Sequence, residues 1–251
     1  HLSIRRQRQM CIRDSITTNR TPQFNWSQVT DADGDSINYT IMINCSDNGA
    51  QCTLDDREVN LTGITNTTYV PPTNLKLFGD DSYYYNWSVR AYDGYNYSAW
   101  SSERKITINS LVELTLTTDN VNFGELQLNQ KANTTNPSYP PFVIRNDGNC
   151  YNDLNISISD DLWTSVSAPS QYFQYKVDNV TGEEGAFNSS GSQTNWSNVP
   201  ITNVTFVDLF NYSDAKDSAE IDMLVWVPLS EPPGSRSSIL IFSGWYVKFF
   251  E

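Results

Sequence analysis

The chain has 251 residues and a formal net charge of −13, with 16 Lys and Arg against 29 Asp and Glu. That balance argues against nucleic-acid binding, because phosphate contacts need basic patches. The length suffices for one large or two ordinary domains, and no apolar run reaches the roughly 18 residues that a membrane helix needs. With 13% aromatic residues, the composition is that of a folded acidic surface and not of a disordered acidic tail.

The N-terminal residues differ from the rest of the chain. Residues 1–15 contain four of the 16 basic residues, one of the four cysteines and the only histidine, His1. The run RQRQMCIRDS resembles translated sequencing-adapter read-through of the kind found in metagenomic sequences. We therefore expect residues 1–16 to be a non-native or disordered arm, with a short basic arm as the alternative. In the first case the native first strand and any signal peptide lie upstream.

Residues 17–109 show the period-two alternation of half-buried β-strands. It is clearest over residues 83–94, where Tyr83, Tyr85, Trp87 and Val89 alternate with polar residues before an Asp-Gly turn. Further strands are predicted over residues 21–26, with Phe24 and Trp26 facing inward, and over 37–45, 59–72 and the segment ending at 108. No segment of the chain shows sustained helical spacing.

The sequence YYYNWSVRAYDG at residues 83–94 resembles the sixth strand of a fibronectin type III domain. SAWSSE at residues 98–103 is similar to the bend before the last strand of that fold, and Trp26 stands where its core tryptophan does. The resemblance implies a seven-stranded sandwich in which residues 17–109 supply the second to seventh strands. The first strand would be absent or doubtful, and Tyr85 would close a corner of the sandwich.

The turn DADGDS at residues 31–36 carries three acidic residues at alternate positions, Asp31, Asp33 and Asp35. Such spacing is similar to calcium-binding turns of surface modules, although no Glu follows at the twelfth position as an EF-hand requires. The alternative is a polar turn whose carboxylates cap its own backbone. Calcium is therefore the one possible cofactor that the sequence suggests.

Residues 110–251 are predicted to form a second sandwich. Strand-like segments occur at 112–118, 121–130, 141–149, 154–159, 173–177, 204–209 and 219–227, and a closing strand at 238–242. The order of these motifs resembles Ig-like modules of microbial surface proteins, and the end of the chain resembles β-sandwich domains of archaeal surface proteins. The expected fold class is all-β, with two tandem β-sandwich domains, fibronectin type III-like and then Ig-like.

Acceptor triplets for N-glycosylation are unusually dense. About five would be expected by chance among the asparagines if Ser and Thr make up roughly a fifth of the residues. The alternative is a polar β-rich composition, but Asn25 and Asn155 each stand between two apolar residues, as an outward-facing strand position would. The predicted acceptors are 14 of the 26 asparagines: Asn25, Asn38, Asn44, Asn60, Asn66, Asn86, Asn96, Asn133, Asn155, Asn179, Asn188, Asn195, Asn203 and Asn211.

Two of the four cysteines are close in sequence. Cys45 and Cys52 flank a polar turn, so a local disulfide is predicted, with two ordinary thiols as the alternative and a zinc pair disfavoured because no second pair is near. Cys150 falls in a predicted turn with no obvious partner.

The sequence offers little for catalysis. His1 lies in the arm, which removes Ser-His-Asp and Cys-His systems, and no phosphate-binding Gly loop or G-x-S-x-G motif occurs. Aromatic residues could form a face for sugars or proteins, or they could simply cover an edge of the first domain. They are Tyr84, Tyr92, Tyr95, Tyr97 and Trp100.

We therefore expect non-catalytic structural or adhesive modules from a secreted, N-glycosylated cell-surface protein, of which this chain is a fragment. The expected partners are other surface proteins or glycans, with no nucleic acid and no membrane insertion. The first alternative is a pair of accessory modules on an extracellular hydrolase that acts on polysaccharide or protein. The second is a calcium-dependent adhesion module.

Overall fold

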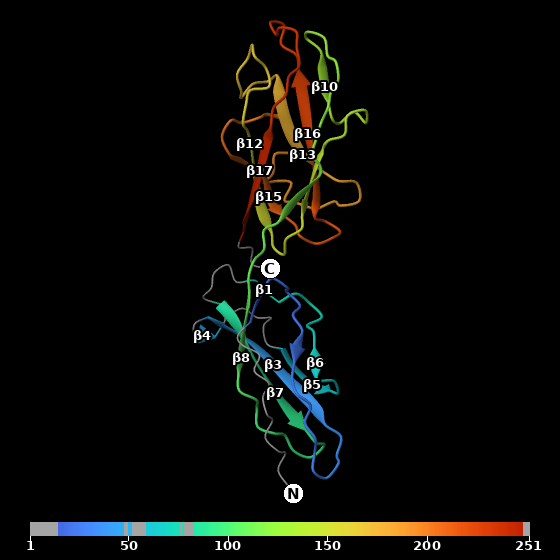
Figure 1. Ribbon diagram of the computed structural model, residues 1–251, viewed down its shortest axis with the longest axis vertical. Coiled ribbons are helices and arrows are strands. Elements are labelled where there is room, and N and C mark those ends of the chain that lie inside the picture. Colours follow the sequence, from blue (N-terminus) through green and yellow to red (C-terminus); the bar gives the residue numbers. More distant parts are fainter. Residues whose placement is uncertain (1–14, 48–49, 52–58, 76, 78–82, 248–251) are drawn as a thin grey trace. The chain divides into compact units, whose positions relative to one another are not determined.

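The computed structural model describes residues 15–47, 50–51, 59–75, 77 and 83–247. Every regular element among these residues is a β-strand, and none is a helix, so the predicted all-β fold is confirmed. The chain divides into two compact units with the boundary between Ser110 and Leu111, and Figure 1 labels the strands of each unit. The predicted disordered or non-native arm lies outside the described residues as far as residue 14.

The first unit is a β-sandwich built from a larger and a smaller sheet. The larger sheet has the order β1-β8-β7-β3-β4, with β5 also paired to β3, and the smaller sheet pairs β2 with β6. The bounds are β1 Ser15–Thr17, β2 Phe24–Asn25, β3 Asn38–Asp47, β4 Ala50–Gln51, β5 Val59–Ile64, β6 Thr68–Tyr69, β7 Tyr83–Tyr92 and β8 Arg104–Ile108. The run β8-β7-β3-β5 opposite β2-β6 corresponds to strands G-F-C-C′ opposite B-E of an immunoglobulin-type or fibronectin type III-like sandwich.

The strand predicted over residues 83–94 is central in this sheet. Every residue of β7 pairs with β3, from Asn38 opposite Tyr92 to Asp47 opposite Tyr83. Because successive side chains alternate between faces, one face of the pair supplies most of the core, and Phe24 of β2 closes it from the other sheet. The core residues of the pair are Tyr39, Ile41, Ile43 and Cys45 of β3 and Tyr85, Trp87, Val89 and Ala91 of β7.

The prediction that a first strand is missing is wrong. Ser15–Thr17 forms β1, which pairs in parallel with β8 through Ser15 opposite Ile106 and Thr17 opposite Ile108. The strand therefore includes Ser15 and Ile16, which the sequence had suggested belong to the arm. It leaves no period-two signal because it is three residues long and Ile16 is 73% exposed. Only the hydrogen bonds to the sheet edge define it.

The second unit is also a β-sandwich. One sheet has the order β14-β13-β16-β11-β9, with β10 also paired to β16, and the other has the order β15-β12-β17. The bounds are β9 Leu114–Thr118, β10 Lys131–Asn133, β11 Phe142–Asn146, β12 Asn152–Ile158, β13 Phe173–Asn179, β14 Ser197–Asn198, β15 Val204–Phe210, β16 Ser218–Trp226 and β17 Leu240–Tyr246. Residues such as Ile156, Phe206 and Ile221 pack between the two sheets.

The order of strands in the second unit differs in part from a simple immunoglobulin arrangement. The run β9-β11-β16-β13 corresponds to strands A-B-E-D, and β12-β17 to C-F. However, β13 precedes β15 in the chain, and no strand of residues 111–247 takes the G position beside β17. The β-sandwich is therefore established, while the assignment to an Ig-like module remains a prediction.

Two strands predicted in this unit differ from those in the structure. Residues 121–130 do not form a strand, although Val121, Phe123 and Leu126 still pack on the core, and Gly124 turns the chain with a φ of 65°. The closing strand is β17, and it continues through Trp245 to Tyr246 instead of ending at Phe242.

Candidate functional site

The acceptor asparagines lie at the surface. The sequence contains one acceptor triplet more than the fourteen predicted, since Asn19 is followed by Arg20 and Thr21, and Asn19 is exposed. All fourteen predicted acceptors are among the described residues, and none of them is buried. Asn25, Asn60, Asn66, Asn96, Asn195 and Asn203 are exposed, and the other eight are partly exposed. The described asparagines that are fully buried, Asn146 and Asn152, both stand outside acceptor triplets. Asn146 is held by the fold, since its Nδ2 donates to the carbonyls of Cys150 and Phe210 at 3.0 and 3.2 Å.

The partly exposed acceptors are not equivalent. Asn188 uses its amide nitrogen to donate to Asp208 Oδ2, and its Oδ1 accepts the Ser190 hydroxyl at 2.7 Å. Because a sugar is attached through that nitrogen, Asn188 is the acceptor that the fold engages most directly. Asn44 and Asn86 stand directly opposite each other on β3 and β7. Opposite residues have Cβ atoms about 5 Å apart, so oligosaccharides on both would collide.

Two acceptor triplets on β12 and β15 are joined to each other. Asn155 is paired with Thr205 across the strands. The hydroxyl of Thr205, the third residue of one triplet, donates to Asn155 Oδ1 at 3.1 Å. The hydroxyl of Ser157, the third residue of the other triplet, donates to Asn203 Oδ1 at 2.8 Å. Each asparagine therefore accepts a hydrogen bond from the hydroxyl that belongs to the other triplet.

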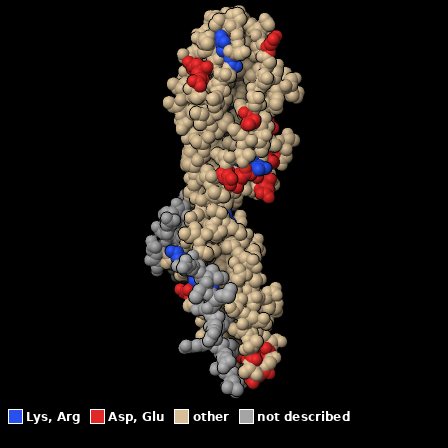
Figure 2. All heavy atoms as spheres, viewed as in Figure 1, with Lys and Arg blue, Asp and Glu red and all other residues tan. Residues whose placement is uncertain are grey.

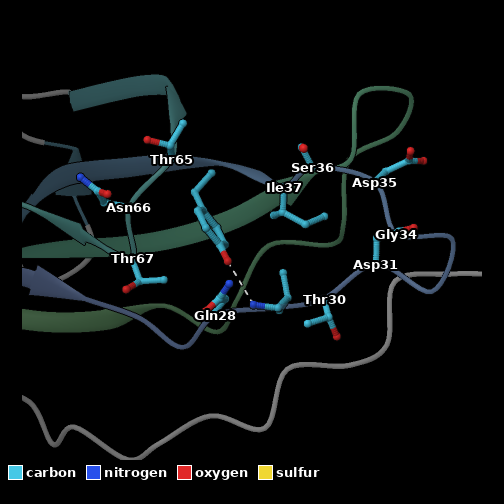
Figure 3. Close-up of a pocket in the computed structure, with 12 residues that line it drawn as sticks. Gln28, Thr30, Asp31, Gly34, Asp35, Ser36, Ile37, Thr65, Asn66 and Thr67 are labelled. Atoms are coloured by element: carbon cyan, nitrogen blue, oxygen red, sulfur yellow. Dashed lines mark hydrogen bonds between the residues drawn. The ribbon is translucent and has the colours of Figure 1, made fainter.

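The acidic turn is organised by its own backbone. Asp31 Oδ1 accepts the amide of Asp33 at 2.8 Å, and Gly34 has a φ of 87° that suits a tight turn. Asp35 is exposed and, in Figure 3, points away from Asn66 and Thr67. Within the described residues no group of three or more His, Cys, Asp or Glu side chains is placed to hold a metal ion. The structure therefore does not bring the three predicted calcium ligands together.

A polar hollow of about 550 Å³ lies beside this turn. Asp31, Asp35 and the segment from Thr65 to Thr67 contribute to its lining, as does the buried Tyr39. The hydroxyl oxygen of Tyr39 accepts the amide of Val29 at 3.0 Å. The hollow is thus formed by the β2–β3 and β5–β6 loops at one end of the first sandwich.

The cysteines separate into two kinds. Cys45, at the inner face of β3, is disulfide-bonded, while Cys52 lies outside the described residues, so its predicted pairing with Cys45 stays a prediction. Cys150 is a buried thiol whose Sγ donates to the Leu111 carbonyl at 3.2 Å. That contact belongs to a junction in which the Leu111 amide also donates to Asn149 Oδ1 at 2.7 Å.

The aromatic edge predicted from the sequence is largely a packed stack. The Arg90 guanidinium lies over the rings of Tyr97 and Trp100, 3.9 and 4.6 Å from their centroids. Tyr97 also packs on Tyr92 with 4.6 Å between ring centroids, and Lys105 covers Tyr84. These contacts favour the interpretation that the residues cover an edge of the first unit. Tyr95, which is 76% exposed, is the most accessible of the five.

Two acidic centres in the second unit could not be found from sequence. Glu231 is 6% exposed and accepts hydrogen bonds from Thr164, Ser165 and Arg236. Burial by itself raises the pKa of Glu231, but the hydrogen bonds from Ser165, Arg236 and the two loop amides outweigh it and hold that pKa far below its usual range. No local motif signals the contact with Thr164 and Ser165, because these two residues are more than sixty positions away from Glu231 in the sequence.

The second centre is a pair of carboxyl groups at a bulge in β12 and β15. Burial, together with the charge of Asp208 and a hydrogen bond to its side chain, raises the pKa of Asp153, although the Leu209 amide donates to Asp153 Oδ1 at 2.9 Å. Leu209 has a φ of 52° in this bulge, an uncommon backbone conformation for leucine. The two aspartates are separated by 55 positions, which again leaves no sequence signal.

The surface charge is dispersed. On the face shown in Figure 2, acidic side chains form small separate groups among uncharged residues. Within the described ranges no helix is long and apolar enough to cross a membrane.

Comparison with known proteins gives limited information. No protein-family model matches the chain, and no curated protein matches it significantly. Among solved structures, a crystal structure of the chicken CNTN1 FN1–FN3 domains aligns with 12% sequence identity and a TM-score of 0.30, covering 95% of this chain and 66% of that chain. Since a superposition at that TM-score is loose, the assignment of the fold rests on the strand orders given above.

Proposed function

We propose that this chain forms non-catalytic structural or adhesive modules of a secreted, N-glycosylated cell-surface protein. Two consecutive β-sandwiches are a common way to space and present other domains. The aromatic edge is packed on Arg90 and Lys105, which suits a structural face better than an open ligand site. The only histidine in the sequence is His1, which supports a role without nucleophilic catalysis.

The observation that carries the proposal is the distribution of asparagines. Fifteen of the 26 begin acceptor triplets, with Asn19 included, and each of these fifteen is at least partly exposed. The two described asparagines in the core are outside triplets. Asparagines outside triplets, such as Asn120 and Asn198, are exposed as well, so the density of triplets supports the proposal more strongly than their exposure does. Glycans at strand positions would also shield backbone edges from pairing with other chains.

The test is secretion of the full chain from a eukaryotic host that glycosylates proteins, followed by site-by-site glycopeptide mapping. We expect high occupancy at exposed acceptors such as Asn66, Asn96 and Asn195, and the lowest at Asn188. Ser→Ala or Thr→Ala changes at the third triplet position, such as Ser98→Ala, provide matched controls that keep the asparagine. A folded, secreted chain without glycans at the exposed asparagines would contradict the proposal.

A calcium-dependent adhesion module is the second candidate, favoured by one observation. Asp31 and Asp35 are among the residues that line the hollow, and carboxylate oxygens are ligands that calcium prefers. Calcium binding would raise the unfolding midpoint of the first unit, by about 2.7 kcal/mol of stability at 100 times the dissociation constant. An unchanged midpoint at millimolar calcium, in the chain and in its Asp31→Asn variant alike, excludes this candidate.

A further inference from the structure

The outer face of the β15-β12-β17 sheet combines two acceptor triplets with exposed apolar side chains. In antiparallel pairs, directly opposite residues point to the same face. Ser157 is opposite Ile241, Asn155 is opposite Ser243, and Asp153 is opposite Trp245. The intervening residues of β12, such as Ile156, are buried in the core. The side chains of Asn155, Ile241 and Trp245 therefore share the face that is turned away from the core.

The apolar residues of this face are accessible. Ile241 is 45% exposed and Trp245 is 38% exposed. Both are diagonal neighbours of Asn155, one on each side of Ser243, and diagonal positions are about 7–8 Å apart. Their exposed apolar atoms offer a surface on which a sugar ring can pack. Asn155 is on the central strand of the sheet, so a group attached to it lies over the middle of the face.

The reciprocal hydrogen bonds orient both amide groups. Oδ1 of Asn155 accepts the Thr205 hydroxyl, and Oδ1 of Asn203 accepts the Ser157 hydroxyl, at 3.1 and 2.8 Å. Each amide oxygen is thereby held against the neighbouring strand. In a planar amide the nitrogen is directed away from the oxygen's partner, so Nδ2 of Asn155 is turned away from β15. The β17 row of Ile241 and Trp245 is on that other side of β12.

We propose that Asn155 carries an N-linked oligosaccharide whose first sugars lie over Trp245 and Ile241. This inference rests on the proposed function. Transfer forms a bond from Asn155 Nδ2 to the anomeric carbon of the oligosaccharide and breaks the bond from that carbon to an activated pyrophosphate carrier. The carrier leaves with the electron pair of that bond, and Nδ2 gives up one proton to it.

The modification is compatible with the observed contacts. After transfer, Oδ1 of Asn155 remains a hydrogen-bond acceptor, so the bond from Thr205 persists. The apolar faces of pyranose rings pack on the indole ring of tryptophan, which presents a large amphipathic surface. Burying that surface stabilises the covered arrangement through the hydrophobic effect. Strand β12 lies between Asn203 and the β17 row, so a glycan on Asn203 begins farther from Trp245 than one on Asn155.

The test is hydroxyl-radical footprinting of the full secreted chain, with oxidation of single tryptophans measured by mass spectrometry. Trp100 is the internal reference because it is 37% exposed, against 38% for Trp245. We expect Trp245 to be oxidised several-fold less than Trp100 in the glycosylated chain. Asn155→Gln should restore its oxidation, and Asn203→Gln should not. Ser157→Ala removes the same triplet while keeping Asn155, and Ser157→Thr restores it, so the test does not depend on one variant.

The outcomes separate the two proposals. Occupancy of Asn155 with Trp245 oxidised as readily as Trp100 overturns this inference and leaves the proposed function standing. If Asn155 carries no glycan while Asn66 and Asn195 do, this inference is likewise overturned and the proposed function stands. Protection of Trp245 that persists in Asn155→Gln shows that a second copy or another protein covers the face, and also overturns the inference. Absence of glycans at every acceptor defeats both proposals.

Discussion

The carboxylate of Glu231 holds both the backbone amide and the hydroxyl of Ser165, at 3.0 and 2.6 Å. The same carboxylate accepts the amide and hydroxyl of Thr164 at 3.1 and 2.9 Å and forms an ion pair with Arg236. One buried side chain therefore joins the loop after β12 to the turn between β16 and β17.

We expect Glu231→Gln to destabilise the second unit by about 3 kcal/mol, because the change leaves Arg236 and the loop donors without a charged partner. The pKa of Glu231 is depressed in the folded state. Its contribution is therefore fully present above the unfolded value of about 4.3 and is lost as the pH falls from there toward the folded pKa. Thermal unfolding as a function of pH measures the effect.

The matched control for this change is Glu184→Gln, since Glu184 is exposed. It should shift the unfolding midpoint little at any pH. Equal midpoints for the Glu231→Gln variant and the unchanged chain at pH 7 would show that the carboxylate does not hold the two loops together.

For the Asp153 and Asp208 pair we expect the opposite dependence of stability on pH. Burial and the neighbouring Asp208 raise the pKa of Asp153, so the folded state binds more protons than the unfolded chain between the ordinary and the raised values. Stability therefore falls as the pH rises through that window. We expect Asp153→Asn to stabilise the unit at pH 7 by roughly 0.5 kcal/mol. The side-chain oxygen of the new asparagine can still accept a hydrogen bond from the Leu209 amide.

The stabilisation should disappear below the ordinary pKa of aspartate, about 3.9, because the protonated Asp153 and the asparagine that replaces it are then both neutral. Unfolding midpoints at several pH values test this, with the exposed Asp119→Asn as the control. A destabilised Asp153→Asn variant at pH 7 would mean that the charge of Asp153 is needed, and would sink the prediction.

Gly148 permits the close contact at the start of the second unit. A Cβ atom at this position would stand 2.2 Å from the Leu111 carbonyl oxygen, so the backbone must shift to admit any side chain. We expect Gly148→Ala to destabilise the unit by about 2 kcal/mol through steric strain. Gly182→Ala is the comparison, because its Cβ would face open space and only its φ of 92° causes strain.

That comparison variant should lose only about 1 kcal/mol. Denaturant unfolding curves of both variants give the difference directly. Similar losses for Gly148→Ala and Gly182→Ala would indicate that the contact with Leu111 relaxes easily.

We expect any one molecule to carry a glycan at Asn44 or at Asn86, which stand opposite each other, but not at both. Their side chains are neighbours across β3 and β7, and two oligosaccharides cannot occupy neighbouring positions about 5 Å apart. We expect intact-protein and glycopeptide mass spectra to show one of the two sites occupied per molecule. Asn86→Gln should raise the occupancy of Asn44, whereas Asn96→Gln should leave it unchanged. Chains carrying glycans at both sites at once would disprove the exclusion.

The sequence by itself determined the longer alternating strands of both units. Alternation is a property of neighbouring residues, so Tyr85, Trp87 and Val89 indicate a half-buried strand without any partner, and β7 is found there. The placement of acceptor asparagines between apolar residues predicts that they face outward in the same way, as Asn155 does between Leu154 and Ile156.

Only the tertiary structure decided which distant residues meet. The three-residue strand β1 exists through its hydrogen bonds to β8. Ser157 meets Asn203 across 46 positions, and Glu231 meets Ser165 across 66. Local patterning specifies which face of a strand is buried, but the partner of a strand and its register are set by the packing of both sheets around a shared core. For that reason the sequence predicts where the side chains face, and the fold decides what they contact.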